Sequence, residues 1–291
     1  MKTRFVCLLL FLSHFVAAQE AWMTLDYEDA KKVALEQGQF LLLYFNDGAD
    51  CAPCDFMDPG FCEPCEVMDF EVWSSYEIQL IQQNFVSIKY EANQLSQAAD
   101  QLEIAELPTT VILDAFGNEY LFIEGYLPQA ELLRLLQGFP QDMREIYAAE
   151  QVARNSRDSY QANFRLADRY QRHSHQAGAY AAGRLLSRSD AAYRKTQRLL
   201  YGRTDAPLGL SQRIELLLIE NQLLRGNHER ALQSLIELQP YFVKSNQPLG
   251  NYLFTLSHRL AGETELARKH YEVLQASNNS QRWLNRLALW Q

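Results

Sequence analysis

The sequence predicts an α/β domain followed by an all-α, repeat-like helical domain. Two observations carry this prediction. Up to about residue 139, short continuous apolar runs typical of buried strands alternate with amphipathic segments typical of helices. From about Asp142 onward, apolar residues recur at helical spacing and no strand pattern is seen. We therefore expect two domains, at residues 19–139 and 140–291.

The first domain is expected to begin with a helix and a buried strand. The segment TLDYEDAKKVALEQG (24–38) is amphipathic, with Thr24 or Asp26 as its N-cap and Gly38 at its end. The segment FLLLYF (40–45) is a short continuous apolar run, which suits a central strand buried on both faces.

Three further elements follow in the first domain. FVSIKY (85–90) has the composition of a second strand. TTVILDAFGNEYLFIEGY (109–126) predicts a β-hairpin that turns at residues 116–118. LPQAELLRLLQG (127–138) predicts a closing helix, with proline near its first turn and glycine past its end.

Two segments of the second domain align with each other at an offset of 36 residues: NQLLRGNHERALQSLIEL (221–238) and SHRLAGETELARKHYEVL (257–274). Gly226 and Gly262 coincide, and in both segments an alanine follows five residues later. This spacing resembles the turn and second helix of a tetratricopeptide repeat, in which the glycine opens a tight turn and the alanine lets two helices approach closely. The alternative is an unrelated helical bundle.

The N-terminus has the features of a secretory signal peptide, which we place at residues 1–18. Lys2 and Arg4 form a positively charged start, and an apolar run (5–18) ends in small residues before Gln19. That run is shorter than the roughly 20 residues needed to span a bilayer, so we favour cleavage over an uncleaved anchor. The mature protein is then periplasmic or secreted, and no other segment is apolar enough for a membrane helix.

The net charge and the placement of the cysteines reduce the number of function classes that fit the sequence. The formal net charge is −9, and cleavage removes Lys2 and Arg4, which gives −11. Nucleic-acid binding needs clustered Lys and Arg, so this balance disfavours it. Cleavage also removes Cys7, and the four remaining cysteines all lie between Cys51 and Cys65. A structural disulfide framework spreads its cysteines along the chain, so this cluster in an oxidising compartment indicates a site.

The cysteines lie in two consecutive copies of an eleven-residue segment, CAPCDFMDPGF and CEPCEVMDFEV. Each copy has C-x-P-C, then Met at its seventh position and Asp at its eighth. In a redox C-x-x-C pair, one thiolate attacks a disulfide and the other resolves the mixed disulfide. The candidate catalytic residues are therefore Cys62, Cys65, Cys51 and Cys54.

These elements, in this order, resemble the thioredoxin family. They are closest to its secreted branch, which includes the C-terminal domain of the periplasmic disulfide-reductase transporter. The order is a helix, the strand 40–45, a C-x-x-C that opens a helix, the strand 85–90, and Leu107-Pro108-Thr109 ahead of another strand. The resemblance implies that Pro108 is cis and faces the active cysteines, and that Leu107, Pro108 and Thr109 bind the substrate. It implies disulfide-containing or dithiol proteins as partners, with no organic cofactor and no metal in the exchange reaction.

The sequence departs from the family around the cysteines. Asp50 and Phe61 precede the two pairs where the family usually has Trp, and Tyr44 takes the place of the buried Asp in thioredoxin's preceding strand. The sequence therefore lacks the family's strand acid for proton handling during resolution. Residues 50–72 also hold seven carboxylates and no Lys or Arg. Nearby negative charge disfavours a thiolate and favours a reducing pair, unless these acids are simply solvated residues of a helix surface.

Either pair fits the family spacing. Counted from the upstream strand, Cys51 stands at the usual distance; counted from the downstream strand, Cys62 does. Insertion of eleven residues by tandem duplication explains both. We favour Cys62 and Cys65 on the sheet-packed helix, with Cys51 and Cys54 as a second dithiol in a loop or short helix above it. The reason is that Asp58-Pro59-Gly60 is a strong breaker, and looping out an insertion costs little free energy.

The leading hypothesis is a secreted or periplasmic thiol-disulfide oxidoreductase whose helical domain binds a protein partner. A second hypothesis is a copper or zinc handling protein on a thioredoxin scaffold, because Met57 and Met68 add soft thioethers to the four cysteines. The histidines offer that hypothesis no support, since they are distant in sequence and expected at the surface. A third is a non-catalytic interaction module.

Overall fold

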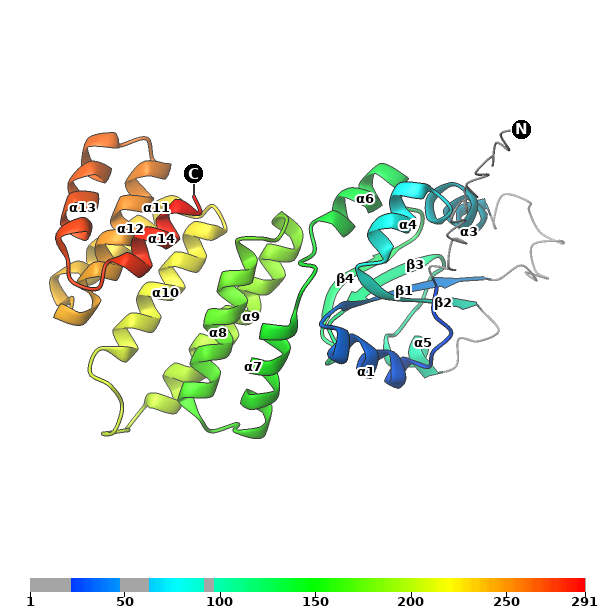
Figure 1. The fold of residues 1–291 in the computed structure, drawn as a ribbon, viewed down its shortest axis with the longest axis horizontal. Helices are drawn as coiled ribbons and strands as arrows, with labels where there is room; N and C mark the ends of the chain where they lie inside the picture. Colours follow the sequence, from blue (N-terminus) through cyan, green and yellow to red (C-terminus); the bar gives the residue numbers. More distant parts are fainter. Residues whose placement is uncertain (1–21, 48–62, 92–96, 291) are drawn as a thin grey trace, which may run out of the picture.

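A computed structural model describes residues 22–47, 63–91 and 97–290 (Figure 1). The expected signal peptide and three of the four candidate cysteines lie outside the described residues: 1–18, Cys51, Cys54 and Cys62.

The first part of the chain forms a four-stranded mixed sheet in the order β2-β1-β3-β4. The pair β1/β2 is parallel, whereas β1/β3 and β3/β4 are antiparallel. The strands are β1 (Phe40–Asn46), β2 (Phe85–Glu91), β3 (Thr109–Leu113) and β4 (Glu119–Glu124). The helices are α1 (Tyr27–Gln37), α3 (Glu63–Val67), its π-helical continuation η1 (Met68–Trp73), α4 (Tyr76–Gln82), α5 (Gln97–Gln101) and α6 (Gln129–Gln137). Figure 1 shows α1 and α5 on one face of the sheet and α3, α4 and α6 on the other.

The apolar run at 40–45 forms the central strand. Every residue of β1 is buried, as a strand covered by helices on both faces requires. The helix before it begins at Asp26, whose carboxylate accepts the backbone N–H of Asp29 at 2.7 Å. It ends at Gly38, which has a left-handed φ of +71°. Local sequence thus sets both the start of α1 and the entry into the sheet.

From Arg144 onward the described chain contains helices and no strand. The helices are α7 (Arg144–Asn155), α8 (Tyr160–Ser174), α9 (Ala179–Leu200), α10 (Leu210–Leu224), α11 (His228–Leu238), the 3₁₀ turns η3 (Gln239–Tyr241) and η4 (Lys244–Asn246), α12 (Gln247–Leu260), α13 (Thr264–Ala276) and α14 (Gln281–Ala288). Among the described helices, none has the length and apolarity that a bilayer crossing requires.

The two aligned segments form helical hairpins, in which α10 packs on α11 and α12 packs on α13. Gly226 and Gly262 lie in the turns with φ of +80° and +77°, a left-handed conformation that favours glycine. Ala231 and Ala267 are buried where each second helix meets its neighbours. Small side chains at these two positions therefore allow the close helix packing.

Replacing Ala231 with leucine is expected to lower the free energy of unfolding by about 1–3 kcal/mol, because the larger side chain overpacks a fully buried site. The urea-unfolding midpoint measures this loss. Ala276→Leu, at an exposed position of α13, is the matched control and should leave the midpoint close to that of the parent protein. Equal midpoints for the two variants would contradict the tight packing at Ala231.

The two parts of the chain pack against each other at α7 and at the start of α9. The Tyr147 hydroxyl donates to the Gln39 carbonyl at 2.8 Å and accepts the Ala115 N–H at 3.2 Å. The Gly178 N–H donates to the Gly138 carbonyl at 2.8 Å, and a Cβ on Gly178 would lie 2.8 Å from the Gly138 Cα. Only glycine permits this approach, and the apolar core continues across the junction.

Candidate active site

Cys65 lies near the start of α3, beyond the carboxyl end of β1. Its side chain is buried, with 4% of its surface exposed. The backbone N–H of Asp47, the residue that follows β1, donates to the Cys65 sulfur. Glu63 is the first described residue of α3, and Cys62, its neighbour in the sequence, lies outside the described residues.

The surroundings of Cys65 favour its protonated form. Burial raises the pKa of the thiol to about 12, and the charges of Asp47 and Asp69 act in the same direction. The hydrogen bond from the Asp47 N–H opposes that shift. A thiol with this pKa is almost fully protonated at neutral pH. Cys65 is therefore suited to resolve a mixed disulfide after a neighbouring base takes its proton, rather than to start the exchange.

Asp69 places a carboxylate about one helical turn after Cys65. Its Oδ2 atom accepts hydrogen bonds from Asn46 Nδ2 at 2.8 Å and from Lys89 Nζ at 3.0 Å. Asn46 ends β1 and Lys89 lies in β2, so two neighbouring strands hold this carboxylate against the sheet. Asp69 is thereby the anchored acid next to Cys65, and it keeps a quarter of its side-chain surface exposed.

Tyr44 lies in β1, at the position where the resemblance to thioredoxin implies a buried Asp. It is fully buried, and its ring centroid lies 5.9 Å from that of Trp22 and 5.1 Å from that of Trp73. Burial, and after it the charge of Asp69, raise the pKa of the Tyr44 hydroxyl far above its usual value, so the phenol stays neutral. Two carboxylates therefore lie near Cys65 in place of an acid within β1: Asp47, which directly follows the strand, and Asp69 of η1.

The sequence alone does not identify Asp69 or Lys89 as site residues. Asp69 is one of the seven acids around the cysteines, and Lys89 lies in a predicted strand. Two signals for them exist in the sequence. The i, i+4 spacing from Cys65 to Asp69 puts both on one helical face. Lys89 is the one charged residue in the apolar run FVSIKY.

The Leu107–Pro108 peptide bond is cis. Pro108 is buried, and its carbonyl accepts the Gly125 N–H at 2.7 Å. Thr109 is the first residue of β3 and pairs with Phe45 of β1. Continued by one residue, this antiparallel register sets Pro108 opposite Asn46, the residue that holds Asp69. The proline segment and the Cys65 site thus lie at the same end of the sheet.

Met68 belongs to the protein core. It is completely buried, and its sulfur accepts the backbone N–H of Leu127 at 3.4 Å. Its thioether is therefore already occupied by contacts inside the domain. Within the described ranges, no group of three or more His, Cys, Asp or Glu residues is arranged to hold a metal ion. Met57 lies outside those ranges.

The expectation that the histidines lie at the surface is wrong for His258, which is buried, and the other described histidines are only partly exposed: His173, His175, His228 and His270. Only 8% of the His258 surface is exposed, and its Nδ1 atom lies 2.6 Å from the Glu263 carboxylate. Its ring stacks with those of Phe254 and His270, because the α12–α13 hairpin folds this face inward.

Residues 27–139 match the family model of the thioredoxin-like domain. The chain therefore carries a thioredoxin-like domain with a mixed four-stranded sheet, followed by a helix-rich C-terminal region. A search of curated proteins finds no match to this chain. The matched range includes Cys65, Asp69 and the cis Pro108, so the candidate site belongs to the thioredoxin-like domain.

Proposed function

We propose that the protein is a secreted or periplasmic thiol-disulfide oxidoreductase with Cys62 and Cys65 as its primary redox pair. The observation that carries the proposal is the buried thiol of Cys65 beside the anchored carboxylate of Asp69. This arrangement lies in a thioredoxin-like domain, at the end of the sheet that also carries the cis Pro108.

The proposed reaction is thiol–disulfide exchange in two steps. The Cys62 thiolate attacks one sulfur of a substrate disulfide, forms a mixed disulfide and releases the other substrate sulfur as a thiolate. Asp69 then accepts the proton of Cys65. The resulting Cys65 thiolate attacks the Cys62 sulfur and expels the second substrate thiolate. The substrate has gained two electrons, and the protein holds a Cys62–Cys65 disulfide.

The electrostatics favour reduction of the substrate over its oxidation. A redox pair is strongly oxidising when its reduced form is stabilised as a thiolate. Here burial and two carboxylates disfavour a thiolate at Cys65. The dithiol is therefore the less stabilised form, and it tends to pass its electrons on. We assign Cys51 and Cys54 to a second dithiol that relays or stores the disulfide.

The helical C-terminal region is proposed as the part that binds a protein partner. The hairpins α10–α11 and α12–α13 repeat the same glycine turn and the same buried alanine. We infer that they are repeats of the tetratricopeptide type. On this proposal the redox site acts on disulfide-containing or dithiol proteins that the helical region brings near.

Reduction of insulin, followed by turbidity with dithiothreitol as the electron source, tests the proposed function. The full chain should be active, Cys62→Ser/Cys65→Ser should be inactive, and Cys51→Ser/Cys54→Ser should keep part of the rate. An inactive parent protein that retains bound copper or zinc would point to metal handling instead. An inactive, metal-free parent protein would leave a non-catalytic interaction module.

Replacing Asp69 with asparagine is expected to slow insulin reduction about tenfold at neutral pH, because resolution loses its proton acceptor. The deficit should shrink as the pH rises, since hydroxide then removes the Cys65 proton directly. The direction of the rate change distinguishes two roles for Asp69. Loss of the Asp69 charge also lowers the pKa of Cys65, so a purely electrostatic role predicts faster resolution.

The control for this change is Glu66→Gln, which removes an exposed carboxylate from the same helix. Its rate and pH profile should match those of the parent protein. A faster Asp69→Asn enzyme, or a pH profile parallel to that of the parent, would rule out the proton-acceptor role.

A further inference from the structure

A basic concavity lies between α7, α8 and α9, and neither Cys65 nor Asp69 is part of its lining. Its volume is about 470 Å³. Its charged lining consists of five cationic side chains and one carboxylate: Arg154, Arg157, Arg188, Lys195, Arg198 and Glu150. The whole chain carries a formal net charge of −9, so this local excess of positive charge is opposite in sign to the net charge of the protein.

The single carboxylate of the lining is already engaged. Glu150 accepts Arg154 Nε at 2.9 Å and the Tyr170 hydroxyl at 3.1 Å. Arg188 is partly buried, with its guanidinium 5.1 Å from the centre of the Tyr120 ring of β4. The remaining three cations form no ion pair with any described residue: Arg157, Lys195 and Arg198.

Several like charges around one concavity repel each other, and low-dielectric walls strengthen the positive potential inside it. Guanidinium groups bind carboxylates and phosphates through paired hydrogen bonds. An anion in this concavity would relieve the repulsion. The lining therefore has the chemistry of an anion-binding site.

The spacing of the cations decides what kind of anion fits. Arg188, Lys195 and Arg198 follow one another along α9, and ten residues of helix extend over about 15 Å. A single phosphate or small dicarboxylate reaches only part of that length. An extended peptide covers it with about five residues at 3.3 Å each.

We propose that this concavity binds an acidic segment of a partner polypeptide, with carboxylates along the segment facing the cations of α9 and Arg157. Cys65 is not part of the lining, and binding there needs no redox step. On this proposal the helical region prefers acidic partner segments. The proposed function assigns it partner binding without any chemical preference.

Fluorescence anisotropy of a labelled hexaglutamate peptide with the full-length chain tests the proposal at low ionic strength. The parent protein should bind, and added salt should weaken binding. Lys195→Glu/Arg198→Glu should weaken binding about tenfold or more, because two attractive contacts become repulsive. Arg157→Glu, in the connection between α7 and α8, should also weaken binding.

The matched control is Arg230→Glu/Lys269→Glu, which makes the same change in net charge at exposed positions of α11 and α13. It should bind the peptide like the parent protein. Far-UV circular dichroism verifies that all variants are folded. Three results would overturn the proposal: no binding by the parent, equal losses in the control and the concavity variants, or tighter binding of inorganic phosphate or oligothymidylate than of hexaglutamate.

Discussion

Replacing Cys62 with serine is expected to abolish insulin reduction, and replacing Cys65 with serine is expected to trap a mixed disulfide on Cys62. Without Cys62 no thiolate is available to attack the substrate disulfide. Without Cys65 the mixed disulfide forms but is not resolved. The high pKa of Cys65 supports this order of events, because a protonated thiol is a poor first nucleophile. Non-reducing gels measure the adduct, and peptide mass spectrometry locates the linked cysteine.

The upstream pair provides the internal control. Cys51→Ser/Cys54→Ser should slow turnover without abolishing it, since the second dithiol only relays or stores the disulfide. The opposite pattern is an adduct on Cys51 when Cys54 is replaced, together with normal activity when Cys62 is lost. That pattern would make the upstream pair the primary centre, and the spacing from β1 would then be the better guide.

The elements of the thioredoxin-like domain were predictable because each has a local cause. β1 is an uninterrupted apolar run between polar residues, which fits a strand buried on both faces. The start and end of α1 follow from Asp26 as N-cap and Gly38 as a left-handed C-terminal residue. The cis Pro108 followed from the family resemblance and not from local physics.

The acid of the site was not predictable in the same way. The setting of Asp69 depends on two hydrogen bonds, from Asn46 and Lys89, which the parallel pairing of β1 and β2 brings together. That pairing belongs to the tertiary structure, which local sequence patterns do not reveal. The inward position of His258 has a similar origin, because it depends on how α12 meets α13. Local periodicity indicates which face of a helix is apolar, but not which polar side chain finds a buried partner.

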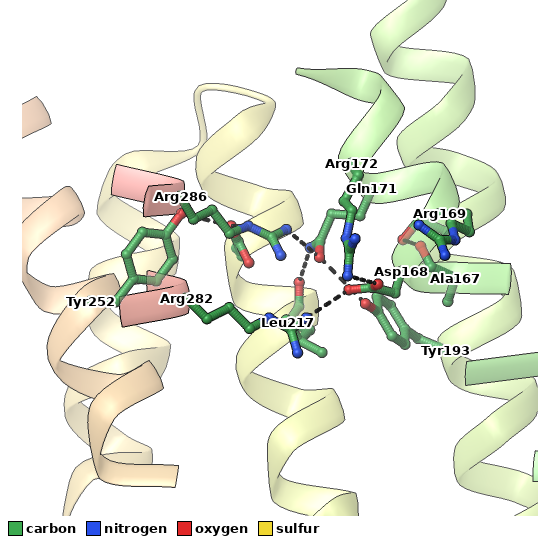
Figure 2. Close-up of polar contacts among 12 residues, drawn as sticks. Ala167, Asp168, Arg169, Gln171, Arg172, Tyr193, Leu217, Tyr252, Arg282 and Arg286 are labelled. Carbon is green, nitrogen blue, oxygen red and sulfur yellow. Dashed lines mark hydrogen bonds and ion pairs between the residues drawn. The ribbon is translucent and has the colours of Figure 1, made fainter. Parts of the chain in front are cut away.

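A buried polar network fastens the last helix to the rest of the helical region. Figure 2 shows the Arg286 side chain running from α14 toward Gln171 of α8, which it contacts at 2.6 Å. Arg286 also forms an ion pair with Glu220 of α10 at 2.6 Å, and the Tyr252 hydroxyl donates to the same carboxylate at 2.7 Å. Glu220 is completely buried and Arg286 is 7% exposed. Arg286 of α14 therefore balances the buried charge of Glu220, in a network that also includes side chains of α8 and α12.

Replacing Arg286 with methionine is expected to lower the free energy of unfolding by about 3–5 kcal/mol, because it leaves the Glu220 carboxylate buried without a counter-charge. Guanidinium unfolding at neutral pH measures the loss. Glu220→Gln/Arg286→Met should recover most of it, since a neutral amide removes the stranded charge and still accepts the Tyr252 hydroxyl. Arg268→Met is the exposed control, which removes an ion-paired arginine from α13 and should leave the unfolding midpoint unchanged.

The loss of unfolding free energy in Arg286→Met should also depend on pH. The titration of Glu220 decides whether this loss grows or shrinks as the pH rises. Burial raises the pKa of this carboxyl, and Arg286 counteracts part of that effect. Without Arg286 the folded-state pKa rises further, whereas the unfolded chain keeps the ordinary value of 4.5. Below that pH both states hold the proton and the variant bears no charge penalty. Above that pH both proteins lose stability, because each unfolded state releases its proton first. The deficit of the variant relative to the parent grows between the folded-state pKa of Glu220 in the parent and its higher folded-state pKa in the variant. A deficit that stays constant from acidic to neutral pH would show that lost packing, and not the stranded charge, destabilises the variant.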